Sequence, residues 1–312
     1  MVIDIKSKFL GAMVGSAIGD AIGELAFRIS DRERLAAYVE MVPELRYTDD
    51  TAMAIGLAES IAEEGGIGQQ ALGRTFARNF LREPWRGYAS GPPTIFSMVE
   101  TQDIPYVEAA RRLFGGSGSL GNGAAMRIAP VGLFFSGSPD LYEQACASAE
   151  VTHAHEVGMD GAAVQAHAIA QAVNQDAGQP FPTETFIREL EDLARTAEIK
   201  VKMKIVREAI KKEEAADIAA SRIGRTVAVH ESMPFAVYAF LKHPASFQEC
   251  LFCAVLNGGD RDTLGAMACA ISGAYLGIEA IPLPWREKLE NRRHIEELAL
   301  DLSRKMLNKE KS

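Results

Sequence analysis

Apolar residues recur at helical spacing along most of the chain, and no stretch of any length alternates between apolar and polar residues as a half-buried strand does. The pattern therefore predicts an all-α fold. The apolar segments that read as helices or parts of helices are 9–23, 51–62, 69–80, 106–114, 124–135, 140–152, 158–173, 232–241, 246–256 and 264–277. Residues 81–105 contain Pro84, Pro92 and Pro93 and are predicted to form a loop.

Two further regions have a different character. Residues 184–224 are the most charged part of the chain, but they keep apolar residues at helical spacing, so we expect helices that lie on the surface. Lysine and glutamate are interleaved there, which favours a solvated face over a nucleic-acid site. Residues 285–307 are amphipathic and are expected to close over the core.

Glycines recur every four residues at Gly11, Gly15, Gly19 and Gly23, so they form a bare stripe on one face of the first helix. Another helix can approach such a stripe closely. Small residues at this spacing also occur in membrane helices, but the run is too short to cross a bilayer and contains Asp20. We expect close packing inside a helical core.

Composition narrows the possible functions. The 312 residues include 33 basic and 42 acidic side chains, for a net charge of −9, so binding to nucleic acid or to an anionic membrane is not expected. The apolar residues continue without a linker, which predicts one domain over residues 1–312. The four cysteines lie in apolar surroundings and the start of the chain does not resemble a signal peptide, so we expect a reduced, cytoplasmic protein. No heptad pattern predicts an oligomer, and we expect a monomer.

Two acidic motifs carry the candidate chemistry: residues 47–51 (YTDDT) and residues 257–263 (NGGDRDT). Mg²⁺ and Mn²⁺ prefer oxygen ligands, and the four carboxylates of Asp49, Asp50, Asp260 and Asp262 would balance two divalent ions. The alternative is that each acid pair only caps the helix that follows it. A cap needs a single side chain, so two neighbouring acids in each motif favour the metal site.

The richest glycine tract is residues 115–123 (GGSGSLGNG), which lacks the lysine of a P-loop. Its backbone N–H groups could still bind phosphate, with Ser117, Ser119 and Asn122 as further donors, although such tracts are often only flexible turns. His153 and His155 lack a third zinc ligand nearby. A solvated pair is the default expectation, and contact of one histidine with a phosphate or ribose is the alternative.

Five motifs taken together resemble the ADP-ribosylglycohydrolase family, which includes the dinitrogenase reductase-activating glycohydrolases. They are GAMVGSAIGDAIG (11–23), YTDDT (47–51), GSLGNGAAMRIAPVG (118–132), TH (152–153) and NGGDRDTLGAMACAISGAYLG (257–277). The resemblance implies a compact orthogonal bundle of helices with two Mg²⁺ or Mn²⁺ ions in a cleft. The implied substrate is ADP-ribose linked through its terminal ribose to a protein side chain or a small molecule.

The resemblance also assigns residues to roles. The implied metal ligands are Thr48, Asp49, Asp50, Asp260, Asp262 and Thr263. The implied substrate-binding residues are Ser117, Gly118, Ser119, Leu120, Gly121, Asn122 and His153. Asp49, Asp50 and Asp260 are the implied catalytic acids and bases, and Glu24 is added as a substitute for a family glutamate whose position here is Phe27. Leu120 also departs from the family, where some members have an aromatic residue.

Two other functions fit the same motifs. The chain could be a non-catalytic relative that binds ADP-ribose or serves a structural role. It could also be a metal-dependent phosphohydrolase, which would release AMP or phosphate from ADP-ribose instead of intact ADP-ribose.

Overall fold

A computed structural model of the protein describes residues 4–309. These residues form seventeen α-helices and two 3₁₀ helices, and between residues 4 and 309 the only β-type pairings are two isolated bridges. The predicted all-α fold is confirmed. The helices are α1 (Ile5–Ala26), α2 (Arg32–Met41), α3 (Asp49–Glu64), α4 (Gln69–Arg82), α5 (Gly91–Gln102), α6 (Tyr106–Gly116), η1 (Asn122–Ala124), α7 (Ala129–Phe134), α8 (Leu141–Glu150), α9 (Glu156–Val173), α10 (Thr183–Leu193), α11 (Ala197–Lys211), α12 (Ala216–Ile223), α13 (Val229–Lys242), α14 (Phe247–Val255), α15 (Arg261–Leu276), η2 (Ile278–Ala280), α16 (Leu283–Lys288) and α17 (Arg292–Lys309).

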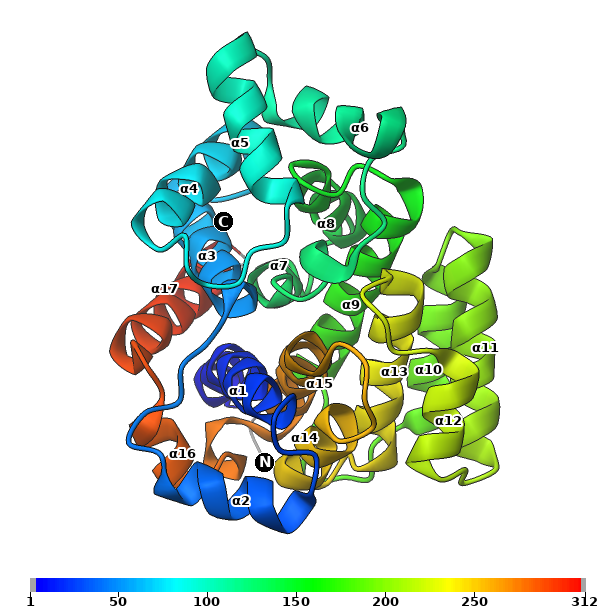
Figure 1. Ribbon diagram of the computed structural model, residues 1–312. Coiled ribbons are helices and arrows are strands. Elements are labelled where there is room, and N and C mark those ends of the chain that lie inside the picture. The colour runs from blue at the N-terminus through cyan, green and yellow to red at the C-terminus, as the bar shows by residue number, and fades with distance from the viewer. Residues whose placement is uncertain (1–3, 310–312) are drawn as a thin grey trace.

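Helices α1 and α15 lie side by side at the centre of the fold and run antiparallel (Figure 1). An added Cβ at Gly19 would lie 2.1 Å from the carbonyl oxygen of Gly265, and one at Gly23 would lie 2.5 Å from the Cα of Asp262. No larger residue fits at these contacts unless the backbones move. The predicted close approach is confirmed, and it brings Asp20 of α1 near the start of α15, where Asp262 lies.

Helix α1 is longer than the sequence pattern indicated. It has 22 residues and is apolar enough, by length and composition alone, to cross a membrane, so the prediction that the run is too short is wrong. In the structure, however, 83% of its most apolar window is buried inside the protein. It serves as the core helix of this fold.

Two helices were missed by the sequence analysis. Residues 91–102 form α5, so the prediction of an uninterrupted loop there is wrong. Pro92 and Pro93 lie in its first turn, where the missing N–H has no helical acceptor to lose. Helix α2 follows Asp31, whose carboxylate accepts the backbone N–H of Arg34 at 2.9 Å. Most of α2 is exposed, which explains its weak apolar signal.

The charged region forms α10, α11 and α12, which lie along one side of the molecule beside α13 (Figure 1). The expected surface position is confirmed, with one buried stripe on each helix: Phe186, Ile187, Leu190, Ile199, Met203, Val206, Ala219 and Ile223. The C-terminal segment breaks between α16 and α17. Helix α17 packs against α1 and α3, as expected of a segment that closes the core.

Candidate functional site

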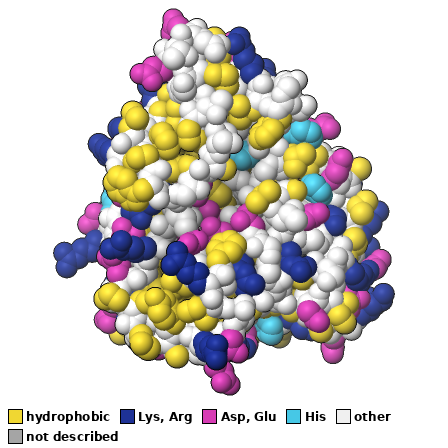
Figure 2. Space-filling model, in the orientation of Figure 1, with side chains coloured by type: hydrophobic (Ala, Val, Ile, Leu, Met, Phe, Trp, Pro, Cys, Tyr) yellow, Lys and Arg dark blue, Asp and Glu magenta, His cyan; other side chains and the backbone are white. Residues whose placement is uncertain are grey.

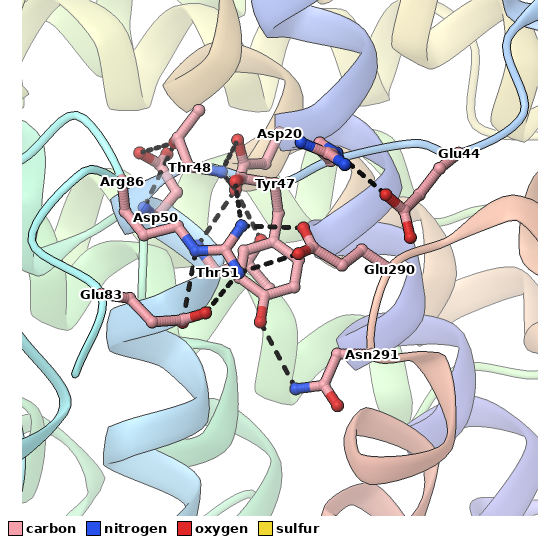
Figure 3. Close-up of polar contacts among 11 residues, drawn as sticks. Asp20, Glu44, Tyr47, Thr48, Asp50, Thr51, Glu83, Arg86, Glu290 and Asn291 are labelled. Carbon is pink, nitrogen blue, oxygen red and sulfur yellow. Dashed lines mark hydrogen bonds and ion pairs between the residues drawn. The ribbon is translucent and has the colours of Figure 1, made fainter.

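Asp20, near the end of α1, fixes the first acidic motif against the centre of the fold. Its carboxylate accepts the backbone N–H of Thr48 at 3.0 Å, the backbone N–H of Thr51 at 3.1 Å and the hydroxyl of Thr51 at 2.6 Å (Figure 3). Thr48 is the N-cap of α3. Asp20 therefore binds the start of the helix that carries Asp49 and Asp50.

The cap interpretation of the two acid pairs is weakened by these contacts. In the first turn of α3, the N–H of Asp50 donates to Oγ1 of Thr48 and the N–H of Thr51 donates to Asp20, so these two groups are capped without the carboxylates of Asp49 and Asp50. Asp260 occupies the N-cap position of α15, but its side chain accepts no N–H of that helix. Its Oδ2 instead accepts the side-chain N–H of Asn122 at 2.7 Å, which joins the second motif to the glycine tract.

Arg86 holds the backbone just before the first motif. Its guanidinium donates to the carbonyl of Tyr47 at 3.1 Å, to Glu290 at 2.7 Å and to Glu83 at 2.8 Å (Figure 3). It also lies 4.1 Å from the centre of the Tyr47 ring. Only 8% of Arg86 is exposed, so it links three distant segments of the chain at a largely dry position.

A cavity of about 680 Å³ opens beside both acidic motifs. Figure 2 shows acidic side chains gathered in the middle of this face of the molecule. The predicted site residues that line the cavity are Asp49, Asp50, Ser117, Gly118, Ser119, Leu120, Gly121, Asn122, His153, Asp260, Asp262 and Thr263. Thr48 and Glu24 do not line it: Thr48 lies behind the acids as a cap, and Glu24 is partly buried one turn beyond Asp20.

Three carboxylates of the cavity, those of Asp49, Asp50 and Asp262, have a raised pKa. Burial raises the pKa of Asp49 to about 7 and that of Asp262 to about 8, and repulsion from Asp20 and Asp260, respectively, adds to these shifts. Burial and the neighbouring acids also raise the pKa of Asp50 well above its usual value. The charged forms of these groups therefore lack compensation from the protein itself.

Carboxylate and hydroxyl oxygens are the donor types that a hard divalent cation prefers. The Oδ1 atom of Asp50 is buried and accepts no hydrogen bond from residues 4–309. A cation at this cluster would compensate both the unpaired oxygen and the mutual repulsion of the acids. As the side chains lie in this structure, however, no group of three or more aspartate, glutamate, histidine or cysteine residues among residues 4–309 could hold a metal ion.

The glycine tract forms a firm wall of the cavity. The backbone N–H of Asn122 donates to the carbonyl of Val227 at 2.9 Å, and the N–H of Val229 donates to that of Leu120 at 3.1 Å. The tract is therefore bound to the segment before α13 and is not simply a flexible turn. Among residues 4–309, the N–H groups of Ser119 and Leu120 find no acceptor, so they are available to a ligand anion.

The two histidines differ from the expected solvated pair. His153 is only 8% exposed and lines the cavity, so that expectation is wrong for it. Burial, with the nearby charge of Arg127, lowers the pKa of His153 to about 3 and keeps its ring neutral. His155 is the N-cap of α9, where its Nδ1 accepts the N–H of Val157 at 3.1 Å.

Comparison with known proteins places this site in context. The family model for ADP-ribosylglycohydrolase matches residues 1–311. The chain belongs to the ADP-ribosylglycohydrolase family. It is similar to ADP-ribosylhydrolase ARH3 of Bos taurus, with 30% sequence identity over 96% of this chain and 93% of the relative. It is also similar to ADP-ribosylhydrolase ARH3 of Homo sapiens, with 33% sequence identity over 85% of this chain and 80% of the relative.

A solved structure described as an ADP-ribosylglycohydrolase-related protein complex has the same fold. Its TM-score is 0.71 at 24% identity, with 97% of this chain and 99% of that chain covered. The ADP-ribosylglycohydrolase fold thus extends over essentially the whole sequence.

Some residues at or beside the cavity were not among the predicted site residues. Asp20 and Arg127 are both fully buried beside the cavity, and their signal was a charge inside an apolar helical run. Met53, Phe114 and Val227 add apolar surface to the cavity. Nothing in their local sequence separates them from ordinary core or surface residues.

Proposed function

We propose that this member of the ADP-ribosylglycohydrolase family is a metal-dependent hydrolase that cleaves the bond between the terminal ribose of ADP-ribose and a protein side chain or small molecule. The single observation that carries the proposal is the meeting of both acidic motifs and the glycine tract in one cavity. The family match and the names of the ARH3 relatives support the same reaction class.

The cavity offers separate surfaces to the parts of such a substrate. The free N–H groups of Ser119 and Leu120 would bind the negatively charged diphosphate. The carboxylates of the two acidic motifs line the same cavity and would receive the terminal ribose. Phe114 and Val227, which are 67% and 64% exposed, supply apolar surface at the same cavity.

The acidic side chains would hold two Mg²⁺ or Mn²⁺ ions through Asp49, Asp50, Asp260, Asp262 and Thr263, which line the cavity. When bound, these ions would supply Lewis acidity to the ribose hydroxyls and lower the pKa of a bound water. Asp49, Asp50 or Asp260 accepts the proton of the attacking water while the ribose develops oxocarbenium character. The predicted role of Glu24 in departure of the leaving group is not part of this proposal, because Glu24 does not line the cavity. We further propose that the protein is monomeric and cytoplasmic.

The test compares wild type with Asp260→Ala and Asp49→Ala. Each substitution should abolish release of ADP-ribose and remove the rise in melting temperature on addition of Mg²⁺. Asp192→Ala, at an exposed position of α10, is the matched control and should change neither. Full activity in either cavity variant would refute the proposal. Binding of ADP-ribose without turnover on any conjugate would support the non-catalytic alternative.

A further inference from the structure

Two buried residues, Arg127 and Thr152, hold His153 through two successive hydrogen bonds. Nη2 of Arg127 donates to Oγ1 of Thr152 at 2.8 Å, and the same Oγ1 lies 2.8 Å from Nδ1 of His153. Arg127 is 0% exposed, Thr152 is 1% exposed and His153 is 8% exposed. Water therefore has little access to the two contacts that connect these side chains.

The protons carried by the side chains of Arg127, Thr152 and His153 determine which group donates in each hydrogen bond. A guanidinium can only donate, so the hydroxyl of Thr152 is an acceptor toward Arg127. Its single proton has one acceptor among residues 4–309, which is Nδ1 of His153. If Nδ1 were protonated instead, the buried hydroxyl proton would have no acceptor, which is strongly unfavourable.

We propose that Arg127 and Thr152 are positioning residues that hold His153 as the neutral Nε2–H tautomer, so that the ring presents one hydrogen-bond donor to the cavity. The low pKa of His153 agrees with a neutral ring. Across residues 4–309, Nε2 has no hydrogen-bond partner.

Two glycines leave room in front of this donor. An added Cβ at Gly123 would lie 2.8 Å from Nε2 of His153, and one at Gly121 would lie 3.5 Å from it. A side chain at position 123 would therefore obstruct the donor. The absence of side chains at these positions keeps Nε2 accessible from the cavity.

The tautomer determines what His153 can do. Its Nε2–H binds an oxygen acceptor, and the free N–H groups of Ser119 and Leu120 belong to the same wall, so the three donors suit an anionic oxygen such as that of a phosphate. In this form Nε2 has no lone pair with which to bind a metal ion or accept a proton. The choice of ADP-ribose as the ligand rests on the proposed function. The assignment of the tautomer rests only on the hydrogen bonds among Arg127, Thr152 and His153.

The experiment is heteronuclear NMR of the histidine side chains in the ligand-free full chain, which distinguishes the protonated ring nitrogen from the bare one. The resonances of His153 are assigned by their loss in His153→Asn. Wild type should show a proton on Nε2, and Thr152→Ser, which keeps the hydroxyl, should show the same. Thr152→Asp places a carboxylate, which only accepts, beside Nδ1, so Nδ1 should carry a proton in this variant.

A proton on Nδ1 in wild type would overturn the proposal, and so would a bare Nδ1 in folded Thr152→Asp. If Thr152→Asp does not fold, the wild-type spectrum alone decides. Adding ADP-ribose to wild type should shift the Nε2–H proton resonance downfield. A confirmed tautomer with no response to ADP-ribose would support the role of Arg127 and Thr152 and count against the proposed function.

Discussion

Asp49→Asn should stabilise the metal-free protein at alkaline pH. Burial and the repulsion from Asp20 raise the pKa of Asp49 from 3.8 to about 7. A shift of about 3 pKa units corresponds to about 4 kcal/mol at roughly 1.4 kcal/mol per unit. Because the remaining carboxylates share this repulsion and relax when one charge is removed, we expect the variant to gain about 1–3 kcal/mol.

The sign of the pH dependence follows from the same shift. The folded-state pKa of Asp49 lies above the unfolded value of 3.8, so the unfolded chain releases its proton first as pH rises. The contribution of this group to folding is therefore fully present below pH 3.8 and is lost as the pH passes through about 7. Asp20 and Asp262, whose pKa values rise to about 6 and about 8, act in the same direction.

The assay is urea denaturation followed by circular dichroism in EDTA, at pH values from about 4 to about 8. Wild type should lose stability across this range, and Asp49→Asn should lose less. Asp192→Asn, at an exposed position, should follow wild type. The reasoning fails if wild type becomes more stable as pH rises, or if Asp49→Asn is less stable than wild type at the alkaline end.

Two further substitutions test the framework that holds the site. Gly19→Ala places a Cβ 2.1 Å from a backbone carbonyl of α15, so thermal unfolding should show a loss of about 1–3 kcal/mol, whereas Gly66→Ala, with nothing within 4 Å, should be nearly neutral. Equal stabilities would contradict the close helix contact. Arg86→Met leaves two carboxylates and a carbonyl without their donor and should lower stability by about 3–5 kcal/mol in denaturant titrations. Arg46→Met, at an exposed ion pair, should change it by less than about 1 kcal/mol, and a similar loss in both variants would refute the role of Arg86.

The sequence predicted those features of the fold and of the site that depend on a short motif which occurs more than once. The four-residue glycine stripe predicts the contact of α1 with a second helix, and the two DD and DRD motifs predict an acidic cluster, since each depends on only a few neighbouring residues. Helix α5 was missed because prolines that favour loops are equally suited to a first helical turn.

The rest depends on tertiary contacts that no local pattern contains. Arg86 binds Tyr47 and Glu290, which are 39 and 204 residues away in the chain. Arg127 reaches Thr152 across 25 residues, and this contact orients a histidine that looked solvent-exposed in the sequence. Such partners become visible only once the helices are packed.

The most direct test of the proposed reaction is the identity of the product. The full chain is incubated with Mg²⁺ and a panel of conjugates in which ADP-ribose is linked to arginine, to serine or to an acetyl ester, and the products are analysed by mass spectrometry. We predict intact ADP-ribose from at least one conjugate, with no release in EDTA. Release of AMP or phosphate in its place, or ADP-ribose release that EDTA leaves unchanged, would contradict the account.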